Sequence, residues 1–310
     1  MPRFSARAYL PGEEQVNLQP ETCPGADPVP QSPEEMRIYE EMSDAEMSDA
    51  MRGDVGADRL VLIGASNLTA GLRYALEEAL HFCPDLDVFA AHGPGRSYGE
   101  THGVLCMGYD GHVSSGLFDA VDAAQSESPR SLKVLLTDLG NDLLYGPTVD
   151  TILAWVDSIV ERANRHAAEL RITSLPIESL ESLTPAKFQV LRRLFFPFRP
   201  TEYQDVLQRT RDLQKGIEEL SRMHERLEVL PVERVWYGFD HIHVRRRDRR
   251  TAFHTWLQTF WPESRTKDAS PNVGRLLRFR PPRHFRVLGL KLRGPQSSVL
   301  AAPGLTVTVY

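Results

Sequence analysis

The 310-residue chain has few cysteines, and no pattern links them. It contains only Cys23, Cys83 and Cys106, and their spacing fits neither a zinc site nor a disulfide framework. There is also no run of about 18 apolar residues, which excludes a membrane-spanning helix. The first residues lack an apolar core of signal-peptide length. We therefore expect a cytoplasmic protein with reduced thiols and no membrane span.

Two common nucleotide-binding motifs are also missing. No Gly-Lys-Ser/Thr sequence occurs, and residues 64–68 (Gly-Ala-Ser-Asn-Leu) lack the three glycines that admit a pyrophosphate.

The serine motif also disfavours an α/β-hydrolase, because Leu68 stands where the nucleophile elbow of that fold has its last glycine. We expect no cofactor, and nothing in the sequence indicates a nucleic-acid partner.

Charge is unevenly distributed along the chain, although the net charge is only -6. Residues 1–57 hold twelve acidic and four basic residues and little apolar surface, which predicts a disordered acidic segment. An over-extended start, with Met47 or Met51 as the true first residue, is the alternative. Residues 263–310 are basic and are predicted to form a C-terminal extension, either a solvated tail or a patch for an anionic polymer, a lipid surface or a partner.

Between these ends, residues 58–262 alternate between two patterns. Apolar runs typical of strands occupy 59–64, 86–91, 131–138, 169–176 and 227–232. Amphipathic segments typical of helices occupy 67–82, 147–166, 185–196, 201–225 and 249–261. The alternation predicts one α/β domain, a three-layer α/β/α sandwich around a mainly parallel five-stranded sheet. Residues 177–226 are long for a crossover, and we interpret them as a helical hairpin docked on the sheet or as a lid over an apolar substrate.

Four polar motifs follow directly after predicted strands, where ligands of parallel sheets bind. The first is Ser66, at a turn between a strand and a helix, where its hydroxyl is exposed beside N–H groups that stabilise negative charge. The second is Asp240-His241-Ile242-His243, in which a carboxylate three residues from an imidazole can orient it as a base.

The other two motifs offer hydrogen-bond donors. Gly140-Asn141-Asp142 places an amide side chain at a strand end, where it can donate to a developing oxyanion. His92-Gly93-Pro94-Gly95-Arg96 contains glycines that let a backbone N–H approach a substrate closely. Asp138 is interpreted as a strand-end carboxylate that supports its loop, and His92, His102 and His112 as residues bordering the cleft without a chemical role.

In this order, the motifs of residues 58–262 resemble the SGNH/GDSL hydrolase superfamily of serine esterases and acyl hydrolases. The resemblance implies a flavodoxin-like fold and hydrolysis of an ester, thioester or acetyl group. By position, Ser66 matches the nucleophile, His243 the base, and Asp240 the residue that orients it. The implied oxyanion hole consists of the Ser66 N–H, the Gly95 N–H and the Asn141 side chain, with Gly93 as the alternative to Gly95.

Some positions depart from the family pattern without removing a reacting group. Ala65 replaces the aspartate that usually precedes the serine, and Leu139 replaces the first glycine of Gly-x-Asn-Asp. His241 and Val244 replace the common glycine and proline around the histidine. The implied partner is a small-molecule, glycan or lipid acyl ester.

Two other functions stay open from the sequence. One is a catalytically inactive binding domain of the same fold. The other is a metal-dependent hydrolase, because Asp240, His241 and His243 could offer three ligands and histidines at i and i+2 have good spacing for chelation.

Overall fold

The computed structural model describes residues 58–104, 107–195, 201–262, 284–287, 290–293, 300–302 and 304–310. The predicted disordered segment, residues 1–57, lies outside them, as does the apolar stretch 196–200. Cys23 and Cys106 lie outside as well, and Cys83 is a free, buried thiol.

The elements follow one another in the order that the sequence pattern predicts, with additions. The strands are β1 (Asp58–Ile63), β2 (Leu86–Ala91), β3 (Met107–Gly108), β4 (Leu132–Leu136), β5 (Glu169–Thr173), β6 (Leu227–Leu230), β7 (His284–Val287), β8 (Leu290–Arg293), β9 (Leu300–Ala302) and β10 (Leu305–Val309). The α-helices are α3 (Ser66–Phe82), α4 (Leu117–Glu127), α5 (Val149–Asn164), α6 (Ile177–Glu181), α7 (Pro185–Phe195), α8 (Tyr203–Met223) and α9 (Arg249–Leu257). Short 3₁₀ segments occur at η1 (His112–Ser114), η2 (Leu139–Leu144), η3 (Arg234–Trp236) and η4 (Gln258–Phe260).

The central sheet confirms the predicted α/β class. Its strand order is β6-β5-β4-β1-β2-β10-β9, and every pairing from β6 to β10 is parallel. Its inner strands β1 and β4 are almost continuous apolar runs, because helices cover both faces of the sheet. A separate small sheet joins β3, β7 and β8 in antiparallel pairs.

The predicted five-stranded sheet lacks two strands that the C-terminal residues add to it. The central sheet has seven strands, because β10 pairs in parallel with β2 and β9 pairs antiparallel with β10. Leu305, Val307 and Val309 of β10 are buried against the same helices as the first strand. The boundary at residue 262 therefore does not end the domain, since the last residues of the chain complete its sheet.

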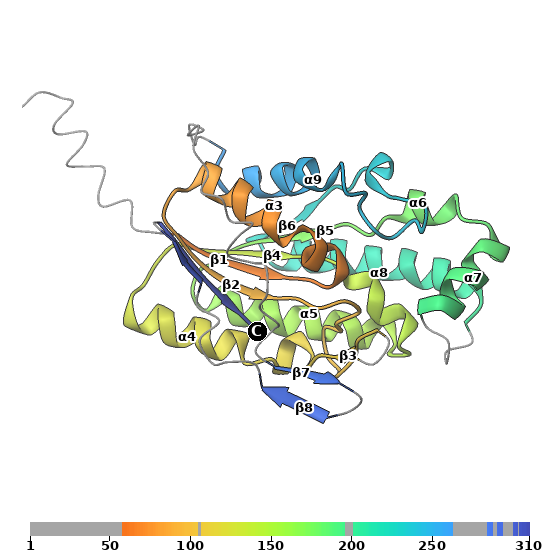
Figure 1. Cartoon of the computed structure of the whole chain (residues 1–310), viewed down its shortest axis with the longest axis horizontal. Coiled ribbons are helices and arrows are strands. Elements are labelled where there is room, and N and C mark those ends of the chain that lie inside the picture. Colours follow the sequence, from red (N-terminus) through yellow and green to blue (C-terminus); the bar gives the residue numbers. More distant parts are fainter. Residues whose placement is uncertain are drawn as a thin grey trace, which may run out of the picture. The chain divides into compact units, whose positions relative to one another are not determined.

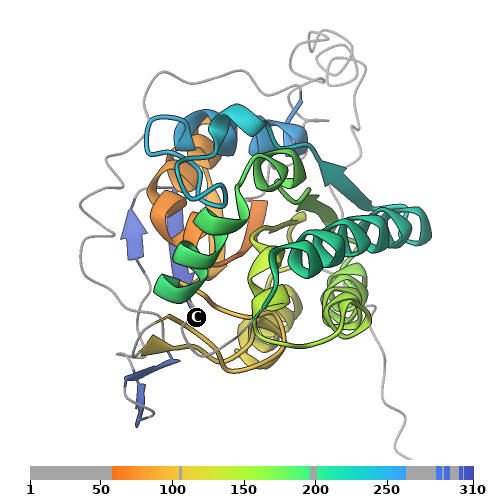
Figure 2. The same cartoon turned by 90° about the vertical axis from the view of Figure 1, so that its right-hand side faces the viewer.

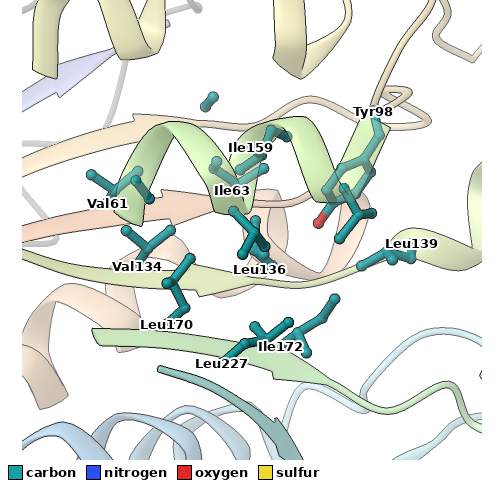
Figure 3. Close-up of a cluster of buried hydrophobic side chains, with 14 of the residues drawn as sticks. Val61, Ile63, Tyr98, Val134, Leu136, Leu139, Ile159, Leu170, Ile172 and Leu227 are labelled. Carbon is teal, nitrogen blue, oxygen red and sulfur yellow. The ribbon is translucent and has the colours of Figure 1, made fainter. Parts of the chain in front are cut away.

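Helices cover both faces of the central sheet (Figures 1 and 2), and two apolar layers hold them to it. Helices α3 and α9 pack on one face, through residues such as Leu76 and Phe253. Helices α4, α5 and α8 pack on the other, where Ile159 of α5 meets Val61, Ile63 and neighbouring strands (Figure 3). The long segment between β5 and β6 contributes α8 to this second layer, as the hairpin interpretation expects, whereas α6 and α7 belong to a smaller cluster.

The order of the strands creates a point where the chain reverses direction across the sheet. Strand β1 lies between β2 and β4, and the helices that follow β1 and β2, α3 and α4, cover opposite faces. Ligands of open parallel sheets bind at such a point, beyond the carboxyl ends of the strands. Ser66 follows β1 and Asp138 to Asn141 follow β4, so both lie there.

The basic run from Arg245 to Arg250 leads into α9 and is engaged in part within the protein. Arg250 forms ion pairs with Glu77 and Glu78, two buried carboxylates of α3. Arg249 donates to the carbonyl oxygens of Val244 and Ala70. These contacts join α9 to α3. In the described part of the chain, no helix is long and apolar enough to cross a membrane.

If β10 is an integral strand, its buried side chains contribute to global stability. Val307 has no exposed surface, and Val307→Ala should lower the free energy of unfolding by about 1–3 kcal/mol. Thr306→Ala, at the neighbouring half-buried position, serves as the matched control and should change it by less than about 0.5 kcal/mol. Urea denaturation followed by circular dichroism measures both, and equal midpoints for Val307→Ala and the wild type would contradict the assignment.

Candidate functional site

Ser66 is the first residue of α3 and follows β1 after a tight turn. Gly64 is required in this turn, because a Cβ there would lie 2.2 Å from the hydroxyl oxygen of Thr137 and 2.8 Å from the Cβ of Leu68. The residue before the serine, Ala65, is buried and gives α3 no side-chain cap. The beginning of the helix therefore needs an acceptor from elsewhere in the chain.

Asp138 supplies that acceptor from the end of β4. Its Oδ2 accepts from the backbone N–H groups of Ala65 (2.7 Å), Asn67 (3.1 Å) and Leu68 (3.2 Å). The N–H of Ser66 lies within this row but has no acceptor among the described residues. Asp138 has a φ of 65°, in the left-handed region that aspartate tolerates better than most residues. The Asp138 carboxylate thus fixes the turn that carries Ser66, and it does not accept from the N–H of Ser66.

Asn67 joins the serine turn to the loop that carries His243. Its Nδ2 donates to Oδ1 of Asp138 (2.7 Å) and to the carbonyl oxygen of Ile242 (3.0 Å). Its Oδ1 accepts from the N–H of Val244 (2.8 Å). A single side chain therefore holds both residues that flank His243. No local sequence pattern indicates the role of Asn67, because its loop partners lie about 175 positions away along the chain.

Ser66, His243 and Asp240 form one line of hydrogen bonds. The Nε2 of His243 is 2.8 Å from Oγ of Ser66, and its Nδ1 is 2.6 Å from Oδ2 of Asp240. The other oxygen of Asp240 accepts from the N–H groups of Ile242 (3.2 Å) and His243 (3.0 Å). The structure therefore brings together the three side chains that the sequence motifs proposed, and both oxygens of the carboxylate are occupied.

The loop that carries His243 follows β6, which is not a neighbour of β1, the strand that precedes Ser66. Strands β5 and β4 separate β6 from β1, so the loop after β6 must cross two strands. It does so as a hairpin in which Gly238 donates to the carbonyl of His243 (2.9 Å) and Arg245 donates to that of Trp236 (2.8 Å). Trp236 and Val244, at the open end of this hairpin, are buried among residues of α3 and α9 and hold the hairpin in place.

The pKa of His243 lies above its ordinary value because the neighbouring Asp240 carboxylate stabilises the charged imidazole. Burial alone lowers the pKa of His243, but the hydrogen bond and negative charge of Asp240 outweigh it, so its pKa lies above 6.5. Burial alone raises the pKa of Asp240, but the contacts with His243 and the N–H of Ile242 outweigh it and hold that pKa below 3.8. The two groups can therefore share a positive and a negative charge once the imidazole takes up a proton.

Asn141 lies in the 3₁₀ segment η2 with a donor that the fold does not use. Its Nδ2 is buried and has no hydrogen-bond partner among the described residues. The neighbouring Asp142 anchors the turn, because its carboxylate accepts from Oγ of Ser97 and from the N–H of Tyr98 (3.0 Å). Burial raises the pKa of Asp142 to about 6, against the lowering effect of these hydrogen bonds. A fixed turn thus presents an unpaired amide beside Ser66.

The loop of residues 92–96 is held by several hydrogen bonds, and its role as an oxyanion donor stays a prediction. Gly95 has a φ of 69°, and its carbonyl accepts from the Tyr145 hydroxyl. Arg96 is fully buried below it and donates to the carbonyl oxygens of Asp110 (2.9 Å) and His92 (3.1 Å). Neither Gly95 nor Gly93 lines the cavity described below.

His92, His102 and His112 lie outside the wall of the cavity described below. Burial, with the charge of Arg96, lowers the pKa of His92 to about 4, and His112 is buried with its pKa well below 6.5. His102 stacks on Tyr145 with ring centroids 4.1 Å apart. None of the three lines the cavity beside Ser66, so the expectation that they border it is not met there.

His241 turns away from His243. Its Nδ1 contacts the Ser179 carbonyl oxygen (2.8 Å) and the Ser182 hydroxyl (3.1 Å), and its Nε2 lies 3.1 Å from Nζ of Lys187. The two imidazoles thus have different partners, and the described residues contain no cluster of three or more metal-ligating side chains. The geometry gives no support to a metal site of Asp240, His241 and His243.

A cavity of about 110 Å³ opens beside Ser66. Asn67, Asp138, Asn141 and Asp240 contribute polar groups near the serine. Much of its remaining wall is apolar and includes Leu139, Leu143, Leu144, Leu175, Pro176, Leu180, Leu183, Phe188, Leu191, Val206, Tyr237, Ile242 and Trp256. Polar side chains also line it, namely those of Thr137, Thr173, Ser174, Arg192 and Thr210. A half-buried serine hydroxyl bonded to an imidazole, with an unpaired amide donor lining the same cavity, has the groups that acyl transfer requires.

No protein-family model and no curated protein matches the sequence. Solved structures similar to this chain include the psychrotrophic esterase EstA from Pseudoalteromonas sp., with 10% identity over 66% of this chain and 97% of that chain and a TM-score of 0.38. The acetyl xylan esterase AlAXEase has 11% identity over 65% and 98% of the two chains, with a TM-score of 0.42. TesA has 15% identity over 66% and 97%, with a TM-score of 0.38. These similarities are distant, and the function proposed below rests on the geometry of the site.

The two asparagines of the cavity should differ in their effect on stability. Asn67→Ala removes three hydrogen bonds and leaves buried partners unpaired, so it should lower the free energy of unfolding by about 2–3 kcal/mol. Asn141→Ala removes a side chain whose buried donor has no partner and should cost less than about 0.5 kcal/mol. Urea denaturation of both variants tests this difference, and an equal loss in the two would contradict the assigned contacts.

Proposed function

We propose that the protein is a serine hydrolase of the SGNH type, which cleaves an ester, thioester or acetyl group through an acyl-enzyme on Ser66. The observation that carries the proposal is the unbroken line from Asp240 through His243 to Ser66, at the polar end of a cavity that also holds the unpaired Nδ2 of Asn141. A nucleophile, a base and an orienting carboxylate within hydrogen-bond distance are the elements that acyl transfer requires.

In the proposed reaction, Oγ of Ser66 attacks the acyl carbonyl carbon while Nε2 of His243 takes the hydroxyl proton. Asp240 keeps Nδ1 of the ring protonated and stabilises the imidazolium that forms. The protonated His243 then gives its proton to the leaving oxygen or sulfur, and the acyl group stays on Ser66. Water attacks this acyl-enzyme with His243 again as base, which releases the acid and restores the serine.

Negative charge on the carbonyl oxygen is stabilised by donors that are already oriented. The Ser66 N–H is the one member of its row that Asp138 does not engage, and Nδ2 of Asn141 is buried without a described partner. Donors fixed in this way cost no reorganisation when the oxyanion forms. The Gly95 N–H is the third donor of the proposal, by its position in the sequence motif.

The decisive experiment combines covalent labelling with turnover. A fluorophosphonate should label the wild-type protein, and Ser66→Ala should abolish both labelling and hydrolysis of p-nitrophenyl esters. Ser158→Ala, an exposed serine of α5, serves as the matched control and should keep both. Asn141→Ala should lower kcat by about 10²–10³-fold. A wild-type protein that neither labels nor hydrolyses any ester would be an inactive binding domain, and undiminished labelling of Ser66→Ala would place the nucleophile elsewhere.

The pH dependence should report the pKa of His243. The reaction needs its neutral form, so kcat/KM should fall as the pH drops through a value above 6.5. Asp240→Asn removes the charge that stabilises the imidazolium, so the midpoint of this acid limb should move to lower pH. It should also reduce kcat by about 10³–10⁴-fold. Rates measured from pH 5 to 9 test both effects, and an acid limb that does not move in Asp240→Asn would argue for a different base.

A further inference from the structure

Asp138 is joined directly to the turn of Ser66 and, through Asn67, to the loop of His243. Its carboxylate accepts four hydrogen bonds at the beginning of α3, three from backbone N–H groups and one from the Asn67 side chain. Uncharged side chains such as serine, threonine and asparagine also cap helices well. Capping alone therefore does not require a charged group at this position.

The hydrogen bonds of Asp138 determine the orientation of Ser66. The carboxylate accepts from Ala65 on one side of the serine and from Asn67 and Leu68 on the other, but not from the serine itself. In the proposed reaction, the Ser66 hydroxyl attacks and its N–H stabilises the oxyanion. Both groups therefore depend on a turn that Asp138 holds, and a displacement of about 1 Å in a reacting group can cost about a hundredfold in rate.

Asp138 also determines which way the Asn67 amide faces. The two ends of an amide have nearly the same shape, but only the nitrogen donates and only the oxygen accepts. Oδ1 of Asp138 accepts from Nδ2 of Asn67 (2.7 Å), so the amide nitrogen lies on that side. In this orientation Asn67 donates to Ile242 and accepts from Val244, the two neighbours of His243.

The charge of Asp138 acts on the His243 ring as well. Burial lowers the pKa of His243, and the hydrogen bond and charge of Asp240, in the same loop, raise it. The charge of Asp138, from the end of β4, raises this pKa further, whereas the charge of Arg249, from α9, lowers it. Two carboxylates from different parts of the fold thus favour the protonated ring.

We propose that Asp138 is a positioning residue of the active site, which orients Ser66 and Asn67 and whose negative charge assists Asp240 in stabilising the protonated His243. This inference rests on the proposed function. A plain helix cap would hold the turn but would leave the proton affinity of His243 unchanged, so the two roles can be separated by experiment.

Asp138→Asn removes the charge and keeps most of the cap. Its amide oxygen can replace Oδ2 and accept from the three backbone N–H groups, whereas its nitrogen replaces Oδ1 opposite Asn67. With p-nitrophenyl esters, kcat should fall about tenfold or more, and KM should change less than about threefold. The acid limb of kcat/KM should move to lower pH by at least about 0.3 pH unit. This shift should be smaller than in Asp240→Asn, because Asp240 also binds the ring directly.

An NMR titration of the His243 imidazole measures the effect of the charge without substrate. Its midpoint should move to lower pH in Asp138→Asn and to higher pH in Arg249→Gln, which removes a charge of opposite sign. Asp150→Asn removes an exposed carboxylate from the first turn of α5. It is the matched control and should keep both kcat and the titration midpoint of the wild type.

The outcomes separate this inference from the proposed function. An unchanged His243 titration in Asp138→Asn makes Asp138 a helix cap only, and an unchanged kcat removes its positioning role; either result overturns the inference and leaves Ser66-dependent hydrolysis intact. If Asp138→Asn does not fold, Asp138→Ser replaces it, and failure of both to fold assigns Asp138 to the fold alone. Absence of Ser66-dependent hydrolysis in the wild type overturns the proposed function and the positioning role with it, even where the titration shifts as expected.

Discussion

The carboxylate of Asp138 is the interaction on which the rest of the site depends. A helix that begins with Ala65 and Ser66 has orphan N–H groups and no side-chain cap of its own. Asp138 accepts three of these N–H groups from the adjacent strand and binds the Asn67 side chain with its other oxygen. Through Asn67, the same carboxylate is connected to the loop of His243. One carboxylate at the beginning of α3 therefore couples the ends of β1 and β4 to a loop that starts at the edge of the sheet.

This coupling explains how His243, in the loop after a distant strand, reaches Ser66. The loop after β6 crosses β5 and β4, and a span of this length would be poorly ordered without contacts along it. Trp236 and Val244 anchor its base in the layer of α3 and α9, Asn67 holds both neighbours of His243, and His241 is bound by α6 and α7. His241 has a φ of 65°, and its ring contacts Ser179, Ser182 and Lys187, so the two histidines of the motif have different partners.

Those features of the molecule that depend on short-range pattern could be predicted from sequence. Strands β1, β2, β4, β5 and β6 follow from apolar runs, and the Asp240–His243 contact follows from a spacing of three residues on a turn. Other features depend on pairing across long sequence separations, for which one sequence carries little signal. The pairing of β10 with β2 is one, since a five-residue run near the end of the chain does not indicate its neighbour. The contacts of Asn67 and the walls of the cavity are others.

Asn67 and Asn141 both line the cavity, but they differ in whether the folded chain satisfies their hydrogen-bonding groups. A buried polar group without a partner is costly, and folded proteins therefore contain few of them. Asn67 satisfies this rule with three hydrogen bonds, whereas Nδ2 of Asn141 does not, although Asp142 holds its turn firmly in place. A donor that is fixed, buried and unpaired gains nothing for the folded state alone. An acceptor that enters the cavity would recover this cost, and in the proposed reaction the oxygen that develops negative charge is such an acceptor.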